Sequence, residues 1–136
     1  MFGKNGAIYS KHWKIPGPGF PIIVDFSTEG GMQTTTVKVD GVEAKGWVIP
    51  LPVFNLVFLQ APRGVLVCGA FDVATMERFQ YAAAKMKGAG GSIIASIEDL
   101  LNGEVREANG PAKALGIEPG QSGREALQRL GPAGQR

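Results

Sequence analysis

An Asp-Gly pair between two strand-like runs constrains the fold of this chain more than any other feature. Asp40 and Gly41 separate residues 33–39, which are rich in Thr and Val, from residues 42–49, and both runs carry a period-two pattern. The two central positions of a tight hairpin turn need positive φ angles, and Asp-Gly is among the pairs that supply them most readily. The sequence therefore predicts a β-hairpin at this point.

Two further strands are predicted directly after this hairpin. Residues 53–60 and 65–68 are apolar runs joined by a turn at residues 61–64. Four successive strands favour an antiparallel meander. The last two strands do not alternate, so both of their faces must be covered. Because few helices are predicted, we expect helices to cover one face and another subunit to cover the other.

A long helix is predicted over residues 73–87. Asp72 stands at its N-cap position, and the apolar residues of the segment fall at spacings of three and four: Val73, Met76, Phe79, Ala83 and Met86. That spacing places them in one stripe of a helix. Lys87 suits the negative end of the helix dipole, and Gly88 suits the stop.

The segments that follow are predicted to be short elements. The glycine-rich residues 88–91 are interpreted as a flexible linker into a strand over residues 92–95. Ser96 is expected to cap a helix over residues 97–101, and Asn109 is expected to start another.

Together these predictions define an α+β fold, with an antiparallel or mixed sheet of about four to five strands that opens with the meander and about three helices packed on one face. A chain of 136 residues has the size of one domain, which we assign to residues 32–131. Residues 1–31 contain a Pro/Gly-rich stretch at 16–21 and are interpreted as an arm, with one short strand at 22–26. Residues 132–136 are interpreted as a tail.

Charge and composition narrow the expected partners. The 14 basic and 12 acidic residues give a net charge of +2 without a dense basic run, so we expect no nucleic acid partner. Residues 47–59 carry no charge but are too short to span a bilayer and contain two prolines, so we expect no membrane insertion. One His and one Cys predict no metal site, and no cofactor is expected. The single Cys and the lack of an N-terminal apolar segment favour the cytoplasm.

Cys68 lies where a predicted buried strand meets a predicted helix, a position at which enzymes often keep a nucleophile. In that interpretation Cys68 and Asp72 are the catalytic candidates, and the backbone amides of Gly69 and Ala70 are possible oxyanion donors. In the alternative interpretation Cys68 is a packed, inert thiol, because free Cys is commonly buried and no basic residue lies near it in the sequence. His12, the only histidine, would have to fold over the junction to form a Cys-His pair. We expect the packed thiol.

A second candidate site lies near the C-terminus. Ser122 and Glu125 have the spacing of a capping box, which predicts the start of the last helix. The alternative is a ligand site for phosphate or another small anion, formed by Ser122, Gly123 and Arg124 at the same helix start.

Two segments together resemble the YunC-like family of bacteria and archaea, also called domain of unknown function 1805. The first is VLVCGAFDV at residues 65–73, and the second joins ALGI at 114–117 to GQSGREAL at 120–127. Their residues, order and separation are similar to those of the family, and the resemblance covers residues 33–130.

This resemblance implies a small α+β domain that tetramerises through an N-terminal β region and has no established activity. Gln121 stands where the family pattern has Met, and the glycine-rich residues 88–91 are longer than usual. The arm at residues 1–31 lies outside the resemblance.

We therefore expect a non-enzymatic cytoplasmic domain that assembles into a homo-oligomer through its β region and holds a small ligand or a protein partner. Two alternatives stay open. One is a thiol-dependent enzyme that uses Cys68, and the other is an anion-binding protein that uses the helix start at residues 122–124.

Overall fold

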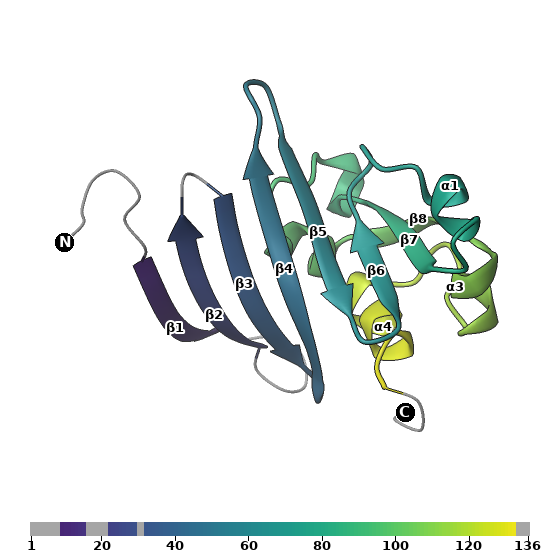
Figure 1. Cartoon of the computed structure of the whole chain (residues 1–136), viewed down its shortest axis with the longest axis horizontal. Helices are drawn as coiled ribbons and strands as arrows, with labels where there is room; N and C mark the ends of the chain where they lie inside the picture. Colours follow the sequence, from purple (N-terminus) through teal and green to yellow (C-terminus); the bar gives the residue numbers. More distant parts are fainter. Residues whose placement is uncertain (1–8, 16–21, 30–31, 133–136) are drawn as a thin grey trace.

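A single eight-stranded sheet organises the chain (Figure 1). The computed structural model describes residues 9–15, 22–29 and 32–132, and the side chains of residues 32–132. The strands are β1 (Tyr9–Ile15), β2 (Ile22–Glu29), β3 (Met32–Val39), β4 (Val42–Pro50), β5 (Asn55–Ala61), β6 (Gly64–Val67), β7 (Ala82–Lys87) and β8 (Glu104–Ala108). They lie side by side in chain order, and every neighbouring pair is antiparallel except β6 and β7.

The predicted meander is confirmed, and so is the hairpin that starts it. Asp40 and Gly41 adopt positive φ angles of 50° and 87° between β3 and β4. Strands β3 to β6 then follow one another as antiparallel neighbours. Within residues 1–31, the described part forms β1 and β2, which continue the sheet beyond β3.

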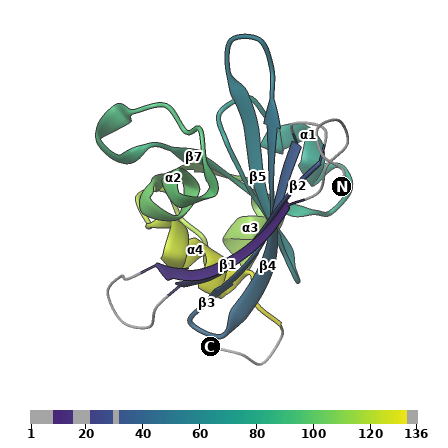
Figure 2. The ribbon, with the colours of Figure 1, turned by 90° about the vertical axis from the view of Figure 1, so that its left-hand side faces the viewer.

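Helices cover the two faces of the sheet unequally. They are α1 (Val73–Glu77), the 3₁₀ turn η1 (Ala89–Gly91), α2 (Ile97–Asn102), α3 (Gly110–Ala114) and α4 (Gly123–Arg129). Buried residues of α2, α3 and α4 join the larger hydrophobic core, whereas Val73 of α1 joins a smaller one on the opposite face with Val65, Val67 and Ala83. Figure 2 shows α2 and α4 on one side of the sheet. The α+β class is confirmed, although the described sheet has more strands than the four to five we predicted.

The prediction of one helix over residues 73–87 is wrong beyond Glu77. Gln80 has a φ of 60°, which ends any helical path, and the chain then enters β7, parallel to β6. Ala83 is buried in the smaller core, while Ala84 and Met86 are buried in the larger one. Burial on both faces between two paired strands outweighs the helical propensity of Ala, Lys and Met.

The strand predicted over residues 92–95 is also absent from the structure. The backbone N–H and carbonyl groups of Ala95 form hydrogen bonds with side chains instead of with another strand. Its N–H donates to Asp99 Oδ2 at 2.9 Å, and its carbonyl accepts from Asn55 Nδ2 at 3.0 Å. The predicted helix starts at Ser96 and Asn109 are confirmed, since both side chains accept hydrogen bonds from the first turn of their helices.

The two strands that are apolar on both faces have different coverings. All four residues of β6 are buried, and α1 covers the face on which we expected a subunit. In β5, Val57 and Leu59 are buried, but Leu56 and Phe58 on the other face are only half-buried. The sheet is therefore incompletely covered along β4 and β5.

Candidate functional site

The incompletely covered side of the sheet carries a line of aromatic contacts. Antiparallel register places Thr34, Trp47 and Phe58 in one row across β3, β4 and β5. Trp47 and Phe58 stack with ring centroids 5.9 Å apart and planes at 16°. Phe71 meets Phe58 edge-on at 5.6 Å, and Lys45 Nζ lies 4.8 Å from the centroid of Trp47. These contacts use the preferred geometries of aromatic and cation–π pairs.

The neighbouring rows extend this surface in two directions. Ile49 and Leu56 are paired and half-buried on one side of the aromatic row. On the other side, beyond Lys45, the exposed Lys38 and Glu43 stand opposite each other. We call this surface the open sheet face, and it comprises Lys38, Glu43, Lys45, Trp47, Ile49, Leu56 and Phe58. It is apolar at one end and carries both signs of charge at the other.

Cys68 is buried, as predicted, at the carboxyl end of β6. Its residue is 4% exposed, and Sγ accepts a hydrogen bond from the Val57 N–H at 3.5 Å. The Cys68 N–H donates to the Val57 carbonyl at 3.0 Å, so backbone groups of β5 hold the residue on two sides. These contacts hold the buried thiol next to the backbone of β5.

A cavity of about 320 Å³ opens beside this thiol. Cys68, Gly69 and Ala70 form one wall, and Lys87 at the end of β7 and Arg106 of β8 contribute charged groups. The cavity thus lies where the only parallel strand pair of the described sheet ends. Ligand sites of α/β sheets favour the carboxyl ends of parallel strands.

Asp72 is occupied as a helix cap, which leaves it poorly suited to be a catalytic base. Its Oδ1 accepts from the N–H groups of Ala74 and Thr75, and its Oδ2 accepts from Thr75 Oγ1 at 2.7 Å. These hydrogen bonds, chiefly the one from the Thr75 side chain, lower the pKa of Asp72 below its ordinary value of 3.8. Asp72 is also not among the residues that line the cavity beside Cys68.

A pair between His12 and Cys68 of the same chain is excluded by strand order. His12 belongs to β1, and Cys68 follows β6, five positions further along the sheet. At about 4.8 Å per strand, the two backbones are roughly 24 Å apart. The side chain of His12 itself lies outside the described residues.

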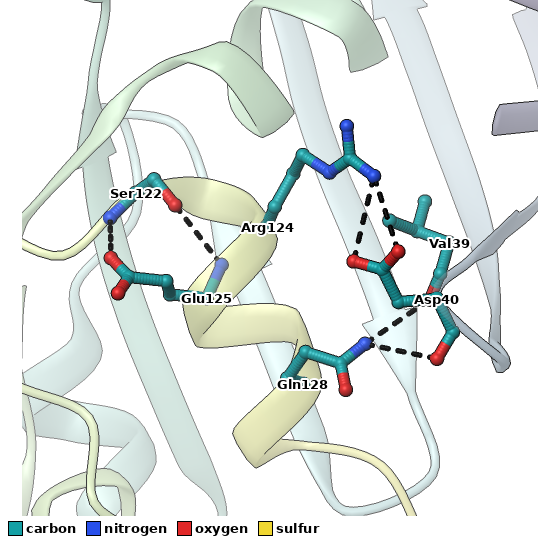
Figure 3. Close-up of polar contacts among 6 residues, drawn as sticks. All are labelled: Val39, Asp40, Ser122, Arg124, Glu125 and Gln128. Atoms are coloured by element: carbon teal, nitrogen blue, oxygen red, sulfur yellow. Dashed lines mark hydrogen bonds and ion pairs between the residues drawn. The ribbon is translucent and has the colours of Figure 1, made fainter. Parts of the chain in front are cut away.

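The predicted capping box at Ser122 is confirmed (Figure 3). Glu125 N–H donates to Ser122 Oγ at 3.1 Å, and the Ser122 N–H donates to Glu125 Oε1 at 2.9 Å. Gly123 packs directly against the backbone of Leu100, with no room for a β-carbon. Arg124 pairs with Asp40, with Nη2 and Oδ1 3.3 Å apart. The polar groups proposed as an anion site are thus engaged within the chain.

Lys87 and Arg106, two candidate binding residues, were not predicted from the sequence. Lys87 was expected at the end of a helix, and no element was expected over residues 104–108. The buried Val105 and Ala108 among charged residues in this last segment, EVREA, were the available signal for a strand, although the adjacent Arg106 and Glu107 interrupt a strict alternation. Among the residues that the structure describes, no three His, Cys, Asp or Glu side chains gather to hold a metal ion. In the same residues no helix is long and apolar enough to cross a membrane.

Comparison with known proteins assigns the chain to a class of uncharacterised domains. The family described as Domain of unknown function (DUF1805) matches residues 67–130. The chain is 30% identical over 102 residues to the uncharacterized protein YunC of Bacillus subtilis (strain 168), a match that covers 73% of this chain and 97% of that protein. The chain therefore belongs to the YunC-like family.

A solved structure has a similar fold. The crystal structure of a protein of unknown function, TA1206 from Thermoplasma acidophilum, superposes with a TM-score of 0.66 at 25% sequence identity. The match covers 74% of this chain and 93% of that chain.

Proposed function

We propose that this chain is a non-enzymatic homo-oligomeric domain that assembles through the open sheet face. The observation that carries the proposal is the stacked pair Trp47 and Phe58, which is half-buried on a side of the sheet that α2 and α4 do not cover. Apolar surface of this kind is commonly buried by a partner. Tryptophan and other aromatic residues are also enriched at the centres of protein interfaces.

The distribution of charge supports a second copy of the chain as that partner. In a two-fold symmetric interface, a surface packs against a rotated copy of itself. The open sheet face carries Lys38, Lys45 and Glu43 at one end, so a copy rotated to bring the two charged ends together offers one carboxylate, its Glu43, to the lysines of the first copy. A face with charge of one sign would instead repel its own copy.

A tetramer is the assembly that family resemblance favours, and the single cysteine fits a reducing cytoplasm, which we propose as its compartment. A two-fold contact through the open sheet face would supply one of the two interfaces that a tetramer with dihedral symmetry needs.

Light scattering coupled to size-exclusion chromatography tests the proposal. We expect the wild-type chain to run as a stable oligomer at micromolar concentration. Trp47→Glu and Ile49→Lys, made separately, should each shift the mass toward the monomer, because each buries a charge in the interface. A stable wild-type monomer would refute the proposal.

Phe79→Glu is the matched control. Phe79 is 77% exposed just beyond α1 and is not one of the residues that define the open sheet face. Its substitution removes an exposed aromatic ring and adds the same charge, and it should leave the mass unchanged. Thermal unfolding of each variant separates loss of assembly from loss of folding.

A further inference from the structure

We propose that the cavity beside Cys68 binds a small amphipathic anion, a carboxylate or a phosphate monoester carried on an apolar body. The cavity measures about 320 Å³. Ligand pockets commonly span about 300–1,000 Å³, so this one suits a small molecule.

The charge around the cavity selects for an anion. Lys87 and Arg106 are its charged lining residues, and no carboxylate lines it. Neither cation makes an ion pair or side-chain hydrogen bond with any residue that the structure describes. By contrast, Nζ of Lys85, two residues before Lys87, lies 3.6 Å from Oε1 of Glu107. The lysine outside the cavity is therefore paired, while the cations at the cavity are available to a ligand.

A β-bulge distinguishes Arg106 from its neighbours. Lys85 pairs with Glu107, but the next residue, Met86, pairs with Val105, so Arg106 is the extra residue between them. Bulges redirect side chains and are frequent next to functional sites. Here the bulge lets Glu107 meet Lys85 while Arg106 lines the cavity. A planar guanidinium can bind a carboxylate or phosphate through two parallel hydrogen bonds.

Apart from Asn55 and Ser92, the other side chains that line the cavity are largely apolar, which indicates that the ligand carries more than its charged group. Met86 and Ile94 are buried against the larger core and line the cavity. Phe54 and Ile93, which also line it, are 44% and 81% exposed. An apolar ligand body would cover these exposed groups while its anionic group meets Arg106 and Lys87.

Backbone groups add hydrogen-bond donors at the same place. Gly69 and Ala70 are exposed in the turn that the hydrogen bond from the Phe71 N–H to the Cys68 carbonyl closes at 3.4 Å. Their own N–H groups have no acceptor among the described residues. A β-carbon on Gly69 would meet nothing within 4 Å, so the space in front of it is open.

Isothermal titration with four probes tests the assignment. Hexanoate and hexyl phosphate carry the two anionic groups on the same apolar chain, hexan-1-ol lacks the charge, and inorganic phosphate lacks the chain. We expect at least one of the two alkyl anions to bind at least about tenfold more tightly than both hexan-1-ol and inorganic phosphate, which is a difference of about 1.4 kcal/mol. The tighter alkyl anion identifies the headgroup. Amide resonances of Gly69, Ala70 and Ser92 should shift on binding.

Matched variants test which cationic side chains bind the anionic group of the ligand. Arg106→Gln keeps much of the aliphatic stem and should weaken binding of the preferred alkyl anion by at least about tenfold. Lys87→Gln should weaken it in the same direction. Arg78→Gln removes one charge from an exposed position at the end of α1 that does not line the cavity, and it should bind like the wild type.

Three results would overturn the proposal. Hexan-1-ol binding as tightly as both anions would show that charge plays no part. If Arg106→Gln and Arg78→Gln weaken binding of the alkyl anion equally, the loss of affinity comes from the overall electrostatic field of the protein and not from a contact at the cavity. Absence of binding by either alkyl anion at millimolar concentration, with the variants and wild type folded by thermal unfolding, would exclude the ligand class.

Discussion

Arg124 of α4 pairs with Asp40, the first residue of the β3–β4 turn, 84 residues earlier in the chain. Its Nη2 lies 3.3 Å from Oδ1 and 3.5 Å from Oδ2 of the carboxylate (Figure 3). Gln128, one turn further along α4, donates to the carbonyls of Val39 and Asp40. The hairpin turn is therefore tied to the last helix by both its side chain and its backbone.

Arg124→Ala should lower the free energy of unfolding by about 1 kcal/mol, because the pair is partly buried rather than fully exposed. Urea denaturation measures the change. Asp40→Asn tolerates the positive φ angle but removes the charge, so a double-mutant cycle isolates the pair. Additive effects of the two substitutions would mean that the ion pair contributes nothing.

Ser122→Ala should also lower the free energy of unfolding by about 1 kcal/mol, the typical effect of removing an N-cap side chain. Ser96→Ala, which breaks the equivalent capping box of α2, should cost a similar amount. Ser92→Ala is the control, since its hydroxyl donates to Ala89 in an exposed loop. If phosphate stabilises the wild type and this effect disappears in Ser122→Ala and Arg124→Ala, the helix start is an anion site after all.

The features that sequence predicted well are those with local causes. A positive φ angle at Asp40 and Gly41 is required by the turn itself. The caps at Ser96, Asn109 and Ser122 each act on the amide three residues further along the chain. Such signals lie within a few residues of sequence, so they can be recognised without knowing the fold.

The features that sequence missed depend on distant pairing. Residues 82–87 have a helical spacing of apolar groups, but they form β7 because β6 and β8 flank them. The cavity residues Lys87 and Arg106 meet only after these strands pair with a bulge. No local pattern reports the register of strands from three separate segments.

Asn109→Ala should lower the free energy of unfolding by about 3 kcal/mol, which is far more than the cap substitutions. Its Oδ1 accepts from the N–H groups of Ala83 and Ala112, and its Nδ2 donates to the carbonyls of Val73 and Tyr81. The residue is 5% exposed, so its loss leaves these backbone groups without partners.

Asn109→Asp provides a sharper test of the same network. The carboxylate can still accept two hydrogen bonds but cannot donate to two carbonyls, so it should also destabilise the fold. Asn102→Ala, at an exposed position at the end of α2, should change the free energy of unfolding by less than about 0.5 kcal/mol. If Asn109→Ala costs no more than this control, the network does not hold α1, β7 and α3 together.

Asp72 should titrate below its ordinary pKa of 3.8 in the folded protein, because Thr75 donates to its carboxylate from both side chain and backbone. A depressed folded pKa means that the contribution of Asp72 to stability is complete above the unfolded value and is lost as pH falls through the folded value. Nuclear magnetic resonance titration of the carboxyl group measures the midpoint. Thr75→Val should raise it, and a wild-type midpoint at or above 3.8 would contradict the capping geometry.

Cys68 should react slowly with a thiol reagent such as dithionitrobenzoate at neutral pH, because the residue is 4% exposed and Val57 donates a hydrogen bond to Sγ. Labelling must await local opening of β5 and β6, so we expect a rate at least about a hundredfold below that of the unfolded chain. The double variant Cys68→Ala, Ala70→Cys supplies the control, since position 70 is exposed at the cavity. Its thiol should react quickly in the native state. If wild-type Cys68 reacts as fast as this control, the thiol is accessible from the cavity, and a thiol-dependent reaction there again becomes the better hypothesis.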